Sequence, residues 1–346
     1  MKASKKINIL LIYTGGTIGM VKDYKTGALK AFDFNNLRER IPELNQLDCK
    51  IKTISFEEPI DSSNMNPTYW IKITTIIEEN YKEADGFVVL TGSDTMSYTA
   101  SAISFMLENL CKPIIFTGSQ LPIGDLRTDA KENLITAIQI ASAREKSKPK
   151  VTEVCLYFEY KLYRANRTTK INAEHFEAFS SSNYPALAES GVHLKFQDHL
   201  LFHSKGEKQL KVRKKLNDNI VILKLFPGIS LEVIKTILGI KGLKGVVLET
   251  YGSGNASTQK EFIALLANAI KRGIEIIDVT QCIGGSVILG HYETSTELQK
   301  IGVVSGNDIT TESAIAKLMY LLGEEIPKEE FKEIFEKSLR GELTDL

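Results

Sequence analysis

Short apolar, β-branched runs alternate along the chain with longer stretches of helical periodicity, and this alternation constrains the fold more than any other feature of the sequence. The strand candidates are residues 7–13, 86–90, 113–117, 153–158, 220–225, 245–249 and 275–279. They are nearly all apolar, as in parallel strands that are covered on both faces. The helix candidates are residues 68–81, 97–109, 129–143, 231–238, 258–272 and 311–322. This order predicts an α/β fold of two domains, with open, mainly parallel sheets flanked by helices.

Residues 203–219 interrupt the alternation, because they are rich in lysine and arginine and carry only widely spaced aliphatic side chains. Such a charge run is typical of a solvated connector rather than of a nucleic-acid patch. We therefore predict a larger N-terminal domain over residues 1–202, a linker over residues 203–219 and a smaller C-terminal domain over residues 220–346.

Charge and cysteine usage exclude several classes of protein. The 43 Lys+Arg residues balance the 43 Asp+Glu residues, which argues against binding to nucleic acid or to an anionic membrane. No apolar run reaches the roughly 18 residues that span a bilayer. The cysteines lack the spacing of a zinc cluster or of a disulfide framework; they are Cys49, Cys111, Cys155 and Cys282. We expect a cytoplasmic enzyme.

Polar, hydroxyl-rich segments follow several of the predicted strands. Chemistry in an open parallel sheet lies beyond the carboxyl ends of its strands. The segments are residues 14–17 (TGGT), 91–95 (TGSDT), 118–122 (GSQLP) and 164–170 (RANRTTK), together with residues 61–65 (DSSNM) before a proline-started helix. Capping or turn formation explains each segment alone. Together they favour an active site in the N-terminal domain.

The missing residue types narrow the chemistry. None of the five histidines lies in these segments, and neither a GxSxG elbow nor a Walker loop is present. A hydroxyl nucleophile that is activated by a lysine, with a carboxylate nearby, remains. A lysine acts as a base when burial or neighbouring cations lower its pKa, and a second hydroxyl can relay the proton.

The motifs TGGTIG, GSDTM, TGSQLP and NRTTK, in this order, resemble those of the bacterial L-asparaginases, most closely the cytoplasmic type I branch. The likeness covers nearly the whole chain, including TYGSGNA and the terminal LRGELT. The resemblance implies hydrolysis of L-asparagine to L-aspartate and ammonia without a metal or organic cofactor. It also implies a homodimer or a homotetramer.

The resemblance implies a role for each matching residue. Thr14 matches the nucleophile that attacks the side-chain amide carbon. A hydroxyl–carboxylate–lysine set matches Ser93, Asp94 and Lys170, with Asp94 also holding the α-ammonium group of the substrate. The substrate-binding positions are Asp61, Ser62, Ser63 and Ser119, of which Ser62 binds the substrate carboxylate and the Ser119 backbone faces the leaving amide.

Three positions depart from the family pattern. The family usually has threonine where this chain has Ser93, and serine lacks the methyl group that stiffens the rotamer. Ala28 stands where the family's lid loop has a tyrosine, and Tyr24 is the candidate substitute.

The third departure concerns a regulatory asparagine site. Part of this site matches Thr280, Gln281 and Cys282, but Glu249 stands at that site's arginine. An anion there repels an effector carboxylate, so we expect no allosteric activation.

Two alternative functions stay open. One is an ammonia-generating subunit of the amidotransferase type, whose relatives carry an extra domain before TGGT, whereas thirteen residues precede Thr14 here. The other is a non-catalytic amino-acid sensor. The presence of Thr14, Asp94 and Lys170 favours catalysis over sensing.

Overall fold

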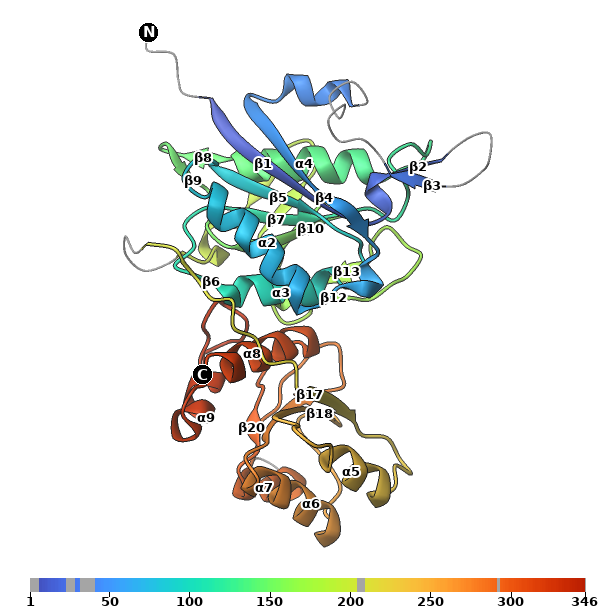
Figure 1. Cartoon of the computed structure of the whole chain (residues 1–346), viewed down its shortest axis with the longest axis vertical. Helices are drawn as coiled ribbons and strands as arrows, with labels where there is room; N and C mark the ends of the chain where they lie inside the picture. Colours follow the sequence, from blue (N-terminus) through green and yellow to red (C-terminus); the bar gives the residue numbers. More distant parts are fainter. Residues whose placement is uncertain (1–5, 23–28, 32–40, 204–208, 291–292, 346) are drawn as a thin grey trace. The chain divides into compact units, whose positions relative to one another are not determined.

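The computed structural model describes residues 6–22, 29–31, 41–203, 209–290 and 293–345. The chain forms two compact units, each with its own α/β core (Figure 1). The first unit comprises Met1–Ser181 and Pro185–Lys214, and the second comprises Ser182–Tyr184 and Lys215–Leu346. The boundary near residue 214 falls inside the stretch 203–219 that we interpret as a linker.

The first unit is built on an eight-stranded sheet whose order is β15-β14-β11-β10-β7-β5-β1-β4. Its strands are β1 (Ile7–Gly15), β4 (Cys49–Ile60), β5 (Gly86–Leu90), β7 (Ile114–Thr117), β10 (Val154–Phe158), β11 (Lys161–Arg164), β14 (Ala188–Ser190) and β15 (Leu194–Phe196). Strands β10, β7, β5, β1 and β4 run parallel, whereas β11, β14 and β15 continue the sheet in antiparallel pairs. The predicted parallel sheet is therefore confirmed for its central part.

Short elements connect these strands. The paired short strands are β2 (Met20–Lys22) with β3 (Leu29–Ala31), β6 (Leu107–Glu108) with β16 (Lys211–Val212), β8 (Arg144–Glu145) with β9 (Lys148–Pro149), and β12 (Thr169–Lys170) with β13 (Phe179–Ser180). The 3-10 turns are η1 (Thr17–Gly19), η3 (Pro42–Gln46), η4 (Ser62–Asn64), η5 (Ala165–Arg167) and η6 (Asp198–Leu200).

Helices cover both faces of this sheet (Figure 1). They are α2 (Pro67–Asn80), α3 (Met96–Met106) and α4 (Ala130–Ser142). Helix α2 begins as the sequence predicts, because the Asn66 side chain accepts the amide of Thr68 and Pro67 takes the first helical position. Ile73 of α2 and Ile103 of α3 share one core cluster with Leu10 and Ile12 of β1. Helix α4 packs on the opposite face.

Strand β4 is absent from the sequence-based prediction. Of its twelve residues only Cys49 and Phe56 are buried, and it pairs with β1 at the edge of the sheet. Wholly apolar runs predict strands that are covered on both faces, and the sequence of this edge strand is not such a run.

The second unit has a four-stranded parallel sheet in the order β17-β18-β19-β20. Its elements are β17 (Ile220–Lys224), α5 (Leu231–Leu238), β18 (Gly245–Thr250), α6 (Lys260–Lys271), β19 (Glu275–Thr280), α7 (Glu293–Ile301), β20 (Val304–Ser305), α8 (Thr311–Gly323) and α9 (Lys328–Glu336). Ser230 caps α5 and Thr310 caps α8 through their hydroxyl oxygens. In the part of the chain that the structure describes, no helix combines the length and apolar character needed to cross a membrane.

Candidate active site

The first strand is irregular at Thr14. The register of β1 against β4 runs unbroken to Tyr13 and shifts before Gly15, so Thr14 lies at the break. Such irregularities re-aim a side chain, and they are common beside active sites. Thr14 is fully buried, and its Oγ1 donates to the carbonyl oxygen of Leu90 in β5 at 3.1 Å.

Two glycines let three loops meet at this point. Gly16 has a φ of 89°, and a Cβ placed on it would lie 2.4 Å from the backbone nitrogen of Gly92. A Cβ on Gly92 would lie 2.4 Å from the Oγ of Ser62. Real Cβ atoms do not approach other atoms so closely, so these contacts require glycine. Residues 14–17, 61–65 and 91–95, far apart in the sequence, therefore lie against one another.

The predicted hydroxyl, carboxylate and lysine also come together. Lys170, in β12, places its Nζ 2.9 Å from Ser93 Oγ and 2.6 Å from Asp94 Oδ1. The lysine side chain is 16% exposed and that of Asp94 is 68% exposed. The lysine side chain is thus largely enclosed, while the carboxylate stays open to a cationic group of a ligand.

Helix capping does not explain the polar residues before α3. The N-cap residue, Thr95, forms no side-chain bond to the helix. Its hydroxyl instead donates to the carbonyl oxygen of Ser62 at 2.8 Å, which ties two of the site loops together. Ser93 and Asp94 both bond to Lys170.

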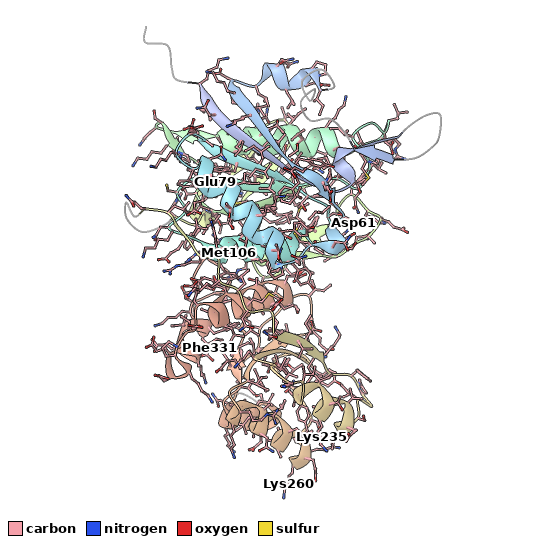
Figure 2. All side chains as sticks on the ribbon, in the orientation of Figure 1. Asp61, Glu79, Met106, Lys235, Lys260 and Phe331 are labelled. Carbon is pink, nitrogen blue, oxygen red and sulfur yellow. The ribbon has the colours of Figure 1, made fainter. Side chains whose placement is uncertain are left out.

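Residues 61–63 (DSS) form a tight turn. Asp61 accepts the Ser63 amide at 2.8 Å and the Ser63 hydroxyl at 2.7 Å, and these two hydrogen bonds lower the pKa of the Asp61 carboxyl. Figure 2 shows Asp61 where β4 gives way to this turn. Ser62 between them is buried. The Asp61–Ser63 pair therefore shapes the turn, and Ser62 faces the meeting point of the loops.

The segment after β7 contains Ser119. It also contains Gln120 and Asp129, whose roles in the site the sequence does not predict. Ser119 is buried and its Oγ donates to the carbonyl oxygen of Leu121 at 2.6 Å. Asp129 accepts the amides of Gln120 and Leu121 and so fixes this loop. Burial raises the pKa of Asp129, against the effect of those amides. The signal in the sequence is an acidic residue at the first position of the predicted helix over residues 129–143.

Gln120 joins the loop to the catalytic set. Its Oε1 lies 3.3 Å from Ser93 Oγ, and its Nε2 donates to the carbonyl oxygens of Ala173 and His175. No pattern in the sequence singles out this contact, because it joins segments that are distant along the chain.

The remaining candidates lie elsewhere. Tyr24 falls outside the described residues. Glu249 belongs to the second unit, where its carboxylate accepts Thr311 Oγ1 at 2.8 Å and lies 3.0 Å from Lys224 Nζ. Gln281 donates to the carbonyl oxygen of Glu249, which orders the end of β19.

The Thr280 hydroxyl accepts the Cys282 amide at 3.1 Å, so these two residues form a local turn. Within the described ranges, no group of three His, Cys, Asp or Glu side chains is placed to hold a metal ion. The first unit thus gathers a buried hydroxyl, a second hydroxyl, a lysine and an open carboxylate, a set suited to acyl transfer through a hydroxyl nucleophile.

Comparisons with known proteins show the family to which the chain belongs. Residues 8–201 match the family model "Asparaginase, N-terminal", and residues 219–335 match "Glutaminase/Asparaginase C-terminal domain". L-asparaginase 1 of Escherichia coli is 40% identical over 98% of this chain and 99% of its own length. The mouse 60 kDa lysophospholipase is 37% identical over 97% of this chain and 62% of its own length. The crystal structure of L-asparaginase I from Vibrio cholerae superposes with a TM-score of 0.89 at 39% identity, covering 98% of this chain and all of that one.

Proposed function

Since this chain belongs to the asparaginase family and hydrolyses L-asparagine to L-aspartate and ammonia, we propose that Thr14 is the nucleophile of the reaction. Family membership confirms the resemblance that the motifs indicate. The observation that carries the assignment is the position of Lys170, whose Nζ bonds both Ser93 and Asp94 in the unit that also holds the buried Thr14 hydroxyl.

The first half of the reaction forms an ester. The Thr14 oxygen attacks the side-chain amide carbon, and Ser93 relays the Thr14 proton to Lys170. For this step Lys170 must be neutral, because an ammonium group cannot accept a proton. The carbon–nitrogen bond then breaks, and the leaving nitrogen takes this proton back from Lys170 through Ser93 and departs as ammonia, which leaves Lys170 neutral again. A β-aspartyl ester remains on the threonine.

The second half of the reaction hydrolyses the ester. A water molecule gives a proton to the same Ser93–Lys170 pair and attacks the ester carbon. The bond to the Thr14 oxygen breaks, the threonine regains its proton, and L-aspartate leaves. The backbone amides near Thr14 and Ser93 supply the donors for the oxyanion of both steps.

The polar groups around this set bind the two ends of the amino acid. The open carboxylate of Asp94 pairs with the α-ammonium group, and Ser62 binds the α-carboxylate with Asp61 and Ser63 shaping its turn. The backbone of Ser119 faces the leaving amide. The burial of Ser62 and the exposure of Asp94 support this division.

We further propose a cytoplasmic homodimer or homotetramer, with catalysis in the N-terminal domain, residues 1–202, and assembly through the C-terminal domain, residues 220–346. Large exposed apolar side chains in the second unit support an interface there; they include Ile222, Phe226, Val233, Ile240, Ile283 and Ile288.

The test is ammonia release from L-asparagine, with L-glutamine measured in parallel, for the wild type and Thr14→Ala. Asparagine-dependent release that disappears in the variant supports the nucleophile. Release by both proteins contradicts it. An amino-acid sensor would release none, and an amidotransferase-type subunit would need its acceptor partner for turnover.

A further inference from the structure

We propose that Gln120 is a positioning residue that fixes the rotamer of the Ser93 hydroxyl, a proposal that rests on the catalytic role assigned above to Ser93. Serine lacks the γ-methyl group that Thr14 and Thr95 carry. A β-branched side chain is stiff at χ1, whereas serine distributes over three staggered rotamers. The Ser93 hydroxyl therefore needs an external partner to stay in one orientation.

The side-chain amide of Gln120 has one orientation that satisfies its hydrogen bonds. Its Nε2 donates to the carbonyl oxygen of His175 at 2.9 Å and to that of Ala173 at 3.3 Å. Turning the amide over would set Oε1 against two carbonyl oxygens with no proton between them. The acceptor atom, Oε1, consequently faces Ser93 Oγ at 3.3 Å.

Lys170 decides where the Ser93 proton points in this structure. A protonated lysine only donates, so its 2.9 Å contact uses a lone pair of the serine oxygen. In this resting state the serine proton is directed to Gln120 Oε1, and it turns to Lys170 Nζ when the lysine is neutral and the relay begins. The hydroxyl is held by a donor on one side and an acceptor on the other, and this pair of contacts selects one rotamer.

Gln120 is anchored by segments other than the one that carries the serine. Asp129 accepts its backbone amide at 2.9 and 3.1 Å, and Asp129 is itself 8% exposed. The two carbonyls that hold its side chain lie on a turn in which Asn172 Oδ1 accepts the amides of Glu174 and His175. The glutamine therefore has a place of its own, and the serine rotamer follows from it.

The kinetic consequence is a loss of turnover rather than of binding. Without the acceptor, the serine hydroxyl spends part of its time in rotamers that do not align with Lys170 and the nucleophile. A neutral hydrogen bond of this kind makes a modest contribution, so removing it lowers kcat by about five- to tenfold. KM stays within about twofold, because the groups proposed to bind the substrate are unchanged.

The experiment is a double-mutant cycle on ammonia release, with Gln120→Met, Ser93→Thr and the pair combined. Methionine keeps the length of the side chain and removes both polar atoms. In the enzyme that retains Ser93, we expect Gln120→Met to lower kcat by about five- to tenfold. In the Ser93→Thr background the same change lowers kcat by less than about twofold, because the added methyl group restricts χ1. Equal losses in both backgrounds, or a loss confined to KM, overturn the proposal.

A second variant guards against a general packing defect. Asn172→Ala loosens the turn that holds Gln120 while leaving both Gln120 and Ser93 in place. In the enzyme that retains Ser93 it should reduce kcat by about two- to threefold. In the Ser93→Thr variant it should leave kcat unchanged. Gln139→Met, at an exposed position of α4, is the matched control and should change neither kinetic constant.

Ser93→Ala distinguishes a failure of the catalytic role of Ser93 from a failure of the positioning role of Gln120. Wild-type turnover in Ser93→Ala contradicts the role of the serine itself, and the proposed mechanism fails with it. An inactive Ser93→Ala beside a fully active Gln120→Met overturns only the positioning role of Gln120. Thermal unfolding of each variant shows that the fold is retained.

Discussion

The hydroxyl of Thr14 donates a hydrogen bond to the carbonyl oxygen of Leu90, 3.1 Å away on the neighbouring strand. A carbonyl oxygen is too weak a base to remove the hydroxyl proton, so the Thr14 hydroxyl is not activated as a nucleophile in this arrangement. Attack on an amide carbon requires the hydroxyl to leave Leu90 and turn toward Ser93 and Lys170. The irregularity of β1 at Thr14 supplies a backbone that is not locked into the ladder with β4.

Thr14→Ala should lower kcat for asparagine by at least about a thousandfold, because no other group replaces the covalent step. The loss of one hydrogen bond costs only about 1 kcal/mol of stability, so the variant stays folded. Steady-state ammonia release measures the first effect and thermal unfolding the second. Thr14→Ser, which keeps the oxygen, retains measurable turnover, and an inactive serine variant would argue for a role of the methyl group instead.

Lys170→Met should likewise remove turnover, because a thioether cannot exchange a proton with Ser93. Lys150→Met is the matched control, since Lys150 likewise bonds two side chains, the carboxylates of Glu145 and Asp198, at 2.8 and 2.7 Å. We expect the control to retain the wild-type kcat. If both variants lose activity equally, the effect is one of charge or folding, and the assignment of Lys170 as the base is wrong.

The dependence of rate on asparagine concentration should be hyperbolic. Glu249, which stands at the arginine position of the regulatory site implied by the resemblance, is 9% exposed and already engaged with Lys224 and Thr311. A carboxylate there offers no positive charge to the carboxylate of an effector. Initial rates over a wide range of concentration test this, and a sigmoidal curve would show that an effector binds in spite of Glu249.

Asp278 predicts a pH dependence of stability. Burial raises the pKa of Asp278 to about 7, and among the described residues its Oδ2 has no hydrogen-bond partner. In the unfolded chain this carboxyl titrates near pH 4, so between about pH 4 and 7 the folded state binds more protons than the unfolded state. The free energy of unfolding therefore falls as the pH rises through that window, and this contribution is lost above pH 7.

Asp278→Asn isolates this effect, because the amide keeps an Oδ1 acceptor for Thr250 and does not ionise. Relative to the wild type, the variant should gain about 2–3 kcal/mol in unfolding free energy between pH 5 and pH 8. Chemical denaturation at both pH values gives the comparison. A difference between variant and wild type that is the same at pH 5 and pH 8 would rule out titration of Asp278 in this range.

The second unit contains a buried ion pair whose disruption should be costly. Lys317 and Glu342 are both fully buried, and Lys317 Nζ also donates to the carbonyl oxygens of Phe335 and Lys337. Lys317→Met leaves the buried Glu342 charge without its ammonium partner and should destabilise the unit by about 3–5 kcal/mol. Lys300→Met, which breaks an exposed pair with Glu297, should cost less than about 1 kcal/mol. Denaturation curves of the two variants should differ accordingly.

Local sequence was sufficient for the central strands and for several helices. Residues 86–90 form β5 as predicted, because an apolar, β-branched run of that length is stable as a strand covered on both faces. Helix α2 begins at Pro67, where the Asn-Pro pair predicts a start. The edge strand β4 and the antiparallel strands β11, β14 and β15 depend on which neighbours they meet, so no local pattern announces them.

The sequence by itself determined the kinds of groups in the site: a strand-end threonine, a serine–aspartate pair and a lysine. It did so because their residue types and their places after buried strands are local properties. Only the tertiary structure decided that Lys170 lies 2.9 Å from Ser93 and that Gln120 bonds the same hydroxyl. These contacts join segments 77 and 27 residues apart. They form because the sheet topology brings the ends of these strands together, and no local propensity encodes such an approach.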